Sequence, residues 1–344
     1  MDIYLILLYL CVSIIAIIRA EKKTKSDYLL ISLFGILVIL TCTFKPAYEI
    51  ADAEVYIDDY YASTTNERIE PLSTVLFNAS KIVFSHYTGM FFLFALTSIT
   101  IRLYGIATLA PFLWTSIAIY LYQIFILHDL IQIRAGIASA IILYSIKPLY
   151  LRKLWLYIVL TCIAILFHYS AIIMVPLWFV NPHKIRRWIF YSLIPVCYCC
   201  AFLGFTLSHL VQYIPIGFIQ NGFAAYELTM STKGIEINIL SWPQIVRCII
   251  FIYLLTSYKL IQQHYQYTII LLKVYAIGLC SYIILSDIPT FANRISELLL
   301  VYEILCFPLI AYTVKPKRIG ILITLSIGFI MLLINIYHFK LIPA

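Results

Sequence analysis

Long blocks of apolar residues, separated by short polar breaks, run the whole length of this chain. A helix that crosses a bilayer needs roughly 20 apolar residues, and many of the blocks approach that length. The candidate spans are residues 2–18, 28–44, 89–106, 111–128, 133–149, 154–167, 169–180, 188–205, 243–258, 268–285, 295–313 and 319–338. The pattern therefore predicts an all-α, polytopic membrane bundle of about ten to twelve transmembrane helices, with residues 1–344 as one transmembrane domain.

Composition agrees with this prediction. The 344 residues are 63% hydrophobic and 12% charged, with a mean hydropathy of +0.97, whereas soluble domains carry about a quarter of their residues as charges. The net charge of +8 is spread in small clusters between apolar blocks, which indicates membrane topology and no nucleic-acid partner. All nine cysteines lie in or beside apolar blocks, where cysteine acts as a small hydrophobe, so we expect no disulfide framework and no metal site.

The basic clusters predict which loops face the cytoplasm. They lie at residues 19–25, 147–153, 184–187 and 315–318, and the positive-inside rule places them on the cytoplasmic side. The acidic segment between them is then external. We expect residues 45–88 to form an external acidic loop with an interfacial helix at 72–86, and residues 206–242 to form a second external loop.

Residues 154–180 leave two possibilities open. The stretch between two basic loops is long for one helix and short for two. A single tilted span would put those loops on opposite sides, whereas a hairpin of two short helices with its tip at Phe167–Ser170 keeps both on the same side. The charge rule favours the hairpin.

Ionisable residues close to membrane depth are costly to insert, so they are the first candidates for function. Four external groups stand out: Asp52 and Glu70 in the acidic loop, Asp129 and Arg134 at a break between spans, His168 with Ser170 at the hairpin tip, and Arg294 with Glu297 at a late helix entry.

Each group also has a purely structural interpretation. The acidic residues are consistent with a solvated loop, and His168 with a hydrogen-bonded core histidine. Arg134 is spaced to pair with Asp129, and Arg294 with Glu297 at i,i+3.

Together the groups form a coherent chemical set if their helices adjoin. Arginine grips phosphate with a planar fork of donors, and a helix N-terminus adds partial positive charge. A lipid-linked phosphate or pyrophosphate is the natural ligand of such a site at the outer leaflet. A carboxylate or histidine beside it would serve as general base toward a hydroxyl.

Several runs of residues resemble the EpsG family of bacterial membrane proteins, relatives of the Wzy-type polysaccharide polymerases. The resemblance extends over most of the chain and rests on Asp52-x-x-x-Tyr56, Glu70-Pro71-Leu72, the run from Asp129 to Ala138, the run from Phe167 to Ala171, and the late Arg294. Ala51 departs from the glycine that the family often has before its loop aspartate.

The resemblance implies a membrane glycosyltransferase that makes capsule, O-antigen or exopolysaccharide. Such an enzyme joins oligosaccharide repeat units carried on undecaprenyl pyrophosphate at the outer, periplasmic face of the bacterial cytoplasmic membrane. Its implied partners are this lipid-linked oligosaccharide, membrane lipid, and a chain-length regulator and flippase of the same pathway.

The resemblance also implies roles for individual residues. Arg134 and Arg294 would hold the donor pyrophosphate, and Asp52, Glu70 or His168 would act on the acceptor hydroxyl as the catalytic group, with no order among the three. Further substrate-binding residues would be Tyr56, Gln132, Ser170 and Glu297. The scheme needs no metal and no cofactor, because arginines neutralise the leaving group.

Two other classes of function remain open. An O-antigen ligase or a membrane acyltransferase that modifies the glycan also joins polytopic helices to an external His or Arg, although a ligase would carry a larger late external domain. A lipid-linked oligosaccharide transporter or flippase would place charges near mid-membrane. Because the costly residues are expected at one face, the sequence favours the polymerase.

Overall fold

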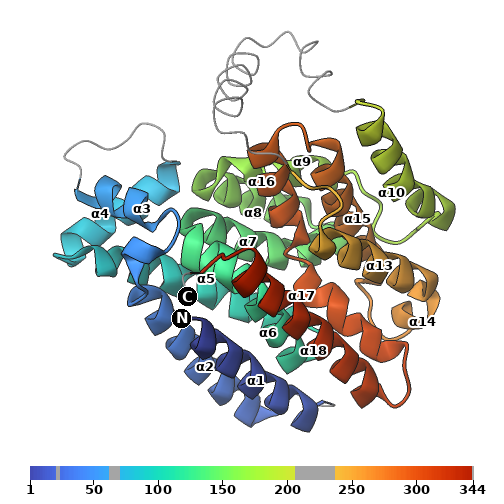
Figure 1. Ribbon diagram of the computed structural model, residues 1–344, viewed down its shortest axis with the longest axis horizontal. Coiled ribbons are helices and arrows are strands. Elements are labelled where there is room, and N and C mark those ends of the chain that lie inside the picture. The colour runs from blue at the N-terminus through green and yellow to red at the C-terminus, as the bar shows by residue number, and fades with distance from the viewer. Residues whose placement is uncertain (21–23, 62–69, 206–236, 343–344) are drawn as a thin grey trace.

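The protein is a bundle of helices (Figure 1), seen in a computed structural model that describes residues 1–20, 24–61, 70–205 and 237–342. Those residues contain helices and no strand. The α-helices are α1 (Asp2–Ile18), α2 (Lys25–Thr43), α3 (Ala53–Tyr61), α4 (Pro71–Val83), α5 (Tyr87–Leu109), α6 (Leu113–Tyr122), α7 (Ile133–Tyr150), α8 (Leu154–Phe167), α9 (Met174–Leu177), α10 (Arg187–Phe202), α13 (Trp242–Thr256), α14 (Tyr258–Gln262), α15 (Thr268–Ile284), α16 (Pro289–Leu300), α17 (Glu303–Cys306) and α18 (Lys317–Leu333). The shorter helical segments are η1 (Ala47–Glu49), η2 (Phe125–Ile131), η3 (Tyr169–Ile173), η4 (Phe307–Tyr312) and η5 (Ile334–His338).

The predicted class, an all-α polytopic membrane protein, is confirmed. In the described part of the chain, four helices are long and apolar enough to cross a membrane, or five if the bent pair α6 and η2 counts as one span. Five further apolar helices have 10–17 residues. The expected ten to twelve spans therefore include helices shorter than a bilayer crossing normally needs.

The interior and the periphery of the bundle differ in what their side chains contact. Every residue of α6 is buried, and so is nearly all of α15. The outer helices instead expose large apolar side chains, for example Leu29 (64% exposed) and Trp155 (79% exposed). Such surfaces are unfavourable in water and suit lipid chains, so the outer helices form the lipid-facing ring.

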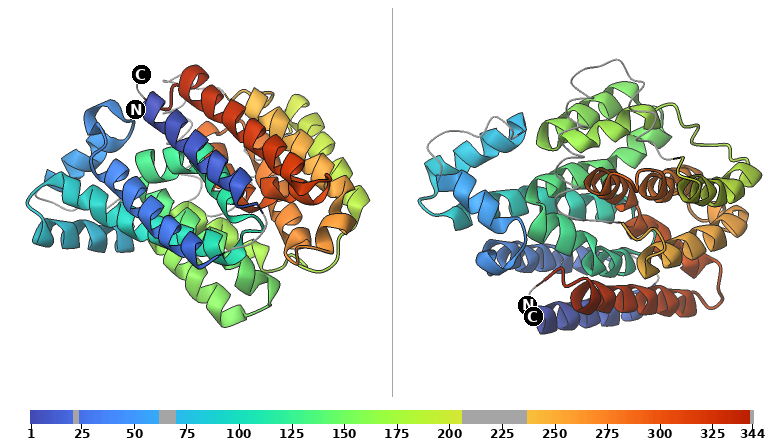
Figure 2. Two further views of the ribbon diagram at one scale, coloured as in Figure 1. Left: turned by 90° about the horizontal axis from the view of Figure 1, so that it is seen from below. Right: turned by 45° about the horizontal axis from the view of Figure 1, so that its top comes forward.

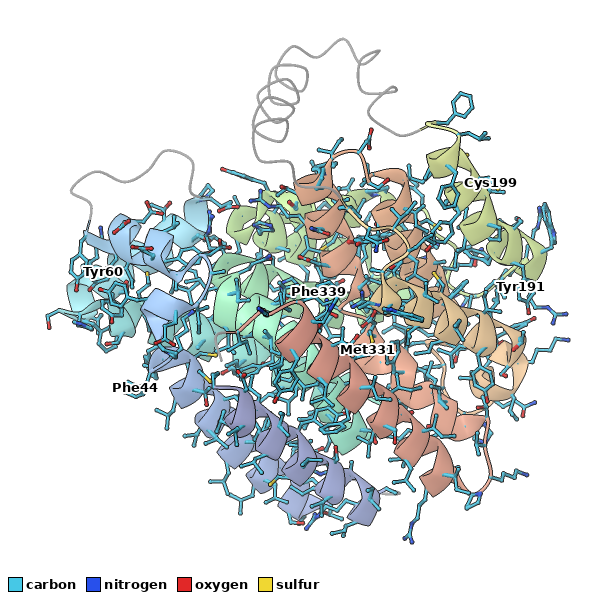
Figure 3. The ribbon with its side chains drawn as sticks, viewed as in Figure 1. Phe44, Tyr60, Tyr191, Cys199, Met331 and Phe339 are labelled. Carbon is cyan, nitrogen blue, oxygen red and sulfur yellow. The ribbon has the colours of Figure 1, made fainter. Side chains whose placement is uncertain are left out.

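Two of the basic segments lie at the opposite end of the bundle from the acidic segment (Figures 1 and 2). The end of α1, the start of α2 and the turn from η4 to α18 lie at one end, whereas α3 and α4 lie at the other. Figure 3 shows that α2 ends next to Phe44, beside the acidic segment, and that α18 runs past Met331 toward Phe339. This arrangement agrees with the charge rule. The side of the membrane that each end faces stays a prediction.

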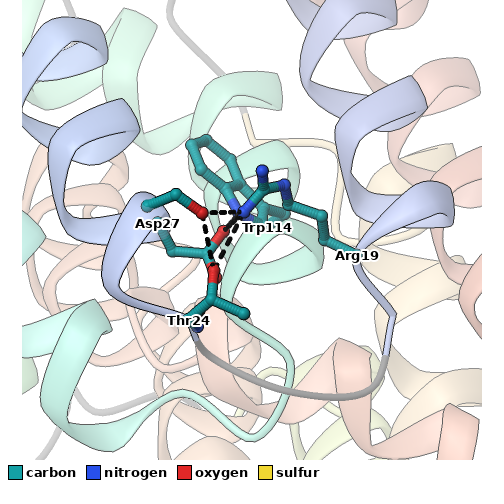
Figure 4. A network of polar contacts seen from close by, with 5 residues as sticks. Arg19, Thr24, Asp27 and Trp114 are labelled. Carbon is teal, nitrogen blue, oxygen red and sulfur yellow. Dashed lines mark hydrogen bonds and ion pairs between the residues drawn. The ribbon is translucent and has the colours of Figure 1, made fainter.

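A polar network ties the basic end together (Figure 4). Arg19 at the end of α1 donates to the Asp27 carboxylate at 2.9 Å, and Trp114 of α6 donates to the same carboxylate at 2.8 Å. Thr24 caps α2 through its backbone and side chain, both bonded to Asp27. These bonds hold the end of α1 and the start of α2 against α6.

Residues 154–180 form the predicted hairpin. Helix α8 ends at Phe167, and the chain returns through η3 and α9. Arg152 donates to the carbonyl oxygens of Trp178 and Val180, and Tyr157 donates to that of Met174 at 2.6 Å, so the two arms lie side by side. The second arm is a 3-10 turn and one helical turn, so the expected helix 169–180 was too long. Pro176 removes one backbone donor there.

Two other expected spans depart from regular α-helices. Residues 111–128 bend by 64° between α6 and η2. The late span begins at Pro289 in place of 295 and continues to Tyr312, with its helix type changing along α16, α17 and η4. Proline is favoured in the first turn of a helix, which explains the earlier start. The start of the expected external loop 206–242, residues 206–236, lies outside the described residues, and so do residues 62–69 of the acidic segment.

Candidate functional site

Glu70, which immediately precedes α4, is the centre of a cluster of four side chains, the others being Arg134, His168 and Tyr56. One carboxylate oxygen of Glu70, Oε2, accepts from Arg134 Nη1 at 2.5 Å. The other, Oε1, lies 3.2 Å from His168 Nδ1 and accepts from the Tyr169 backbone N–H at 3.4 Å. The Glu70 side chain is 5% exposed. It thus joins a residue from the start of α7 to the tip of the α8–η3 hairpin.

Local structure explains how each side chain reaches the cluster. Pro71 occupies the first turn of α4 and leaves Glu70 in an extended conformation at the helix N-cap, so its side chain is free to turn away from α4. Arg134 lies in the first turn of α7, as the sequence predicts. His168 ends α8 with an extended backbone, and Ser73 of α4 donates to the Phe167 carbonyl at 3.0 Å. This bond fixes α4 against the hairpin tip.

Tyr56 completes the cluster from the neighbouring helix α3. The Arg134 guanidinium lies 5.7 Å from the centroid of the Tyr56 ring, and that ring contacts Phe77 of α4 with centroids 6.4 Å apart. A guanidinium over an aromatic face is an attractive contact. Burial raises the pKa of Tyr56 above its ordinary value, because the Arg134 charge offsets this effect only in part. The Tyr56 hydroxyl therefore stays protonated.

The Glu70 carboxylate is held in its charged form. Burial raises its pKa, but the hydrogen bond to His168 and the charge of Arg134 outweigh burial and hold the pKa below the usual glutamate value. A charged Glu70 fixes the Nδ1 proton of His168 on the side facing the carboxylate. Nitrogen Nε2, the other ring atom, then carries a lone pair, and the ring is 12% exposed. The lone pair of Nε2 can accept a proton from a hydroxyl that a substrate brings to it.

Asp52 was predicted with Glu70 and His168 as a catalytic candidate, and it lies one helical turn before Tyr56, whose backbone N–H donates to the Asp52 carbonyl at 3.3 Å. Among the described residues, the ion pairs of Glu70 are with Arg134 and His168 and do not include Asp52. The Asp52 side chain is exposed, and its backbone has φ of 62°, a left-handed conformation that aspartate adopts more easily than most residues. The charge of Asp52 acts on Tyr56 and Lys45 through space. Ser170, in η3, is half-buried next to the cluster.

The suggested pairing of Arg134 with Asp129 is wrong. Asp129 is fully buried and pairs instead with Arg102 of α5, whose Nε lies 3.2 Å from Asp129 Oδ2. Tyr120 donates to the same carboxylate at 2.7 Å, and Ser98 also donates to it. The bend between α6 and η2 turns Asp129 into the bundle and away from Arg134.

Arg294 and Glu297 also do not form the ion pair that their spacing permits. Among the described residues, the ion pairs within 4.0 Å do not include these two. Arg294 is exposed in the middle of α16, because that helix begins at Pro289. Glu297 turns inward, beside the Gln132 side chain, and its Oε2 is buried with no hydrogen-bond partner. The two predicted residues therefore face different surroundings.

Two buried ion pairs within the helices were not anticipated. Besides Arg102–Asp129, Arg247 of α13 binds Glu303 of α17 with Nε 2.6 Å from Oε1. Tyr122 donates to the same glutamate. The expectation that costly residues gather at one face is therefore wrong for these pairs. The signal was present in the sequence, since Arg102, Arg247 and Glu303 each interrupt an apolar block.

A family model described as the EpsG family matches residues 28–344, which is nearly the whole chain. The search of curated proteins and the search of solved structures gave no match. The match includes Tyr56, Glu70, Arg134 and His168, and it begins after α1. The chain belongs to the EpsG family.

Proposed function

We propose that this protein is a membrane glycosyltransferase that polymerises lipid-linked oligosaccharide repeat units into a surface polysaccharide. Membership of the EpsG family indicates a polysaccharide polymerase-like membrane protein. The observation that best supports polymerisation of lipid-linked repeat units is the contact of Glu70 with both His168 and Arg134. This contact supports the proposal, because one residue that would act as base and one that would bind an anion share the same carboxylate partner.

In the proposed reaction, a hydroxyl oxygen of the acceptor sugar attacks the anomeric carbon of the donor sugar. The bond between that carbon and the phosphate oxygen breaks, and lipid pyrophosphate leaves with the electron pair. His168 Nε2 takes the hydroxyl proton as general base. Glu70 is a positioning residue, since it orients the imidazole and stabilises the cation that forms, as a carboxylate does in other histidine dyads.

The arginines provide charge to the leaving group. Arg134 directs one nitrogen to Glu70, and 27% of its side chain remains exposed. Arg294 is exposed on α16, which packs against η3 next to His168. We propose that both guanidinium groups bind the pyrophosphate and offset its developing negative charge. The proposed location is the external face of the bacterial cytoplasmic membrane, the side that the acidic end predicts.

The transporter alternative draws on one specific observation. The ion pairs Arg102–Asp129 and Arg247–Glu303 lie between helices in the interior of the bundle, where transporters hold functional charges. Both pairs are mutually neutralised, and Arg102 also donates to the Gly136 carbonyl at 2.9 Å and to Ser139 at 2.8 Å. We therefore interpret them as structural bridges between helices.

Deleting the gene and separating the surface glycan by size tests the proposal and the alternative together. A polymerase mutant keeps single repeat units on the surface and loses long chains. A transporter mutant loses both. An unchanged distribution of chain lengths would contradict both functions.

A further inference from the structure

We propose that a cavity with polar and apolar walls between α13, α16 and the C-terminal segment binds the neutral sugar residues of the glycan, as a subsite separate from Arg134 and Arg294. This inference rests on the proposed function. The cavity has a volume of about 350 Å³, within the range of sites that hold small molecules. One face of α16 lines it, with Asn293, Ser296, Glu297 and Leu300 at helical spacing.

The charges around the cavity argue for a neutral ligand. Arg247, the one arginine in the described part of its wall, is bound to Glu303 and also donates to the Gln123 side chain. Glu297 adds a carboxylate to the wall. With that arginine neutralised and a carboxylate present, the described wall offers no net positive charge to a pyrophosphate, so an anion is disfavoured.

The remaining wall groups suit a polyhydroxylated ligand. Glu297 Oε2 is buried and has no hydrogen-bond partner, which is costly unless a ligand donor satisfies it. Asn293, Asn238 and Ser241 add amide and hydroxyl groups, and Tyr282 and Phe339 add aromatic surface. Sugars present several hydroxyl donors and an apolar ring face, so they match both kinds of wall.

Position connects the cavity to the Glu70 cluster. Helix α16 packs against η3, which follows His168, and against α7, which carries Arg134. The Gln132 side chain lies beside Glu297, two residues before Arg134. A glycan held in the cavity would therefore lie along α16, the helix that also contacts η3 and α7.

Binding by the full-length protein in lipid nanodiscs tests this proposal. The probe is the repeat-unit oligosaccharide of the host's surface glycan, freed from lipid by mild acid. We expect Glu297→Gln and Asn293→Leu to weaken binding at least tenfold. Phe291→Leu is the matched control on α16, since Phe291 is exposed and lies outside the cavity wall. Inorganic pyrophosphate should not displace the oligosaccharide.

The outcomes separate this inference from the proposed function. If gene deletion shortens the glycan but Glu297→Gln and Asn293→Leu bind the oligosaccharide as the wild type does, the cavity is not the sugar site and the function stands. If deletion leaves chain length unchanged while binding still depends on Glu297, the function fails and the sugar site stands. No binding by the wild type, or displacement by pyrophosphate, overturns the inference.

Discussion

Glu70 and His168 are 98 positions apart in the sequence, yet Glu70 Oε1 lies 3.2 Å from His168 Nδ1. The contact exists because α4 packs against the α8–η3 hairpin and Ser73 is bonded to Phe167. It assigns different roles to two residues that the sequence leaves as equal candidates for the base. Glu70 has both oxygens engaged, and His168 has one ring nitrogen to offer a substrate.

His168→Ala should reduce the rate of chain extension by a factor of about 10² to 10⁴, because the group that takes the hydroxyl proton is removed. The amount of inserted protein should stay close to wild type, since Glu70 keeps its ion pair with Arg134 when the imidazole is removed. Glycan length on gels and a membrane immunoblot measure the two quantities. His183→Ala is the control, an exposed histidine outside the cluster. Normal extension by His168→Ala would exclude the proposed base.

The stability contributed by Glu70 should depend on pH. Its folded-state pKa lies below the ordinary value of 4.5, so the stabilisation is complete above pH 4.5 and is lost as the pH falls through the folded-state pKa. Thermal unfolding of the purified protein and of Glu70→Gln from about pH 7 to about pH 3 measures this effect. We expect the wild type to be more stable at neutral pH and the difference to shrink at acid pH. A constant difference would show that the Glu70 charge is not what stabilises the site.

Arg294→Ala should strongly reduce chain extension while leaving the protein folded, since Arg294 is exposed and is not paired with Glu297. Arg294→Lys should retain part of the activity, because it keeps the charge and loses the planar fork. Single-turnover extension in membrane vesicles with added lipid-linked donor measures both variants. Full activity in Arg294→Ala would show that this arginine only interacts with the membrane surface.

Arg102→Leu, in contrast to Arg294→Ala, should affect folding and not only activity. It leaves Asp129 buried without its ion-pair partner, which typically costs about 3–5 kcal/mol, so we expect loss of folded protein. The double variant Arg102→Leu/Asp129→Leu removes both charges and should recover part of the stability. Fluorescence-detected size-exclusion chromatography after heating measures both. A stable Arg102→Leu protein would argue that this pair is functional and not structural.

Thiol labelling tests the predicted sides of the membrane. In a background in which the exposed cysteines Cys11, Cys162 and Cys199 are replaced, Asp52→Cys should react with a membrane-impermeant reagent added to intact cells. Arg187→Cys, at the basic start of α10, should react only after the membrane is opened. Labelling of Arg187→Cys from outside would reverse the topology.

Local patterns predicted much of the fold, because hydrophobic blocks and charge clusters act over short distances. The break at His168 followed from two basic loops too close together for ordinary spans. Partner choice was not predictable in the same way. Arg134 has Asp129 nearby in sequence and binds Glu70, 64 positions away, because a bend of the chain turns Asp129 toward Arg102.

Helix α1 shows what such distant contacts mean for biogenesis. Its Tyr9 hydroxyl donates to the Leu325 carbonyl of α18 at 2.8 Å, across 316 positions of sequence, and Gly328 leaves room for that hydroxyl. During synthesis α1 enters the membrane long before α18 exists. The Tyr9 hydroxyl therefore lacks its partner on α18 until the end of synthesis, and we expect this part of the bundle to close only when α18 arrives. Proteins truncated before α18 should be recognised by membrane quality control.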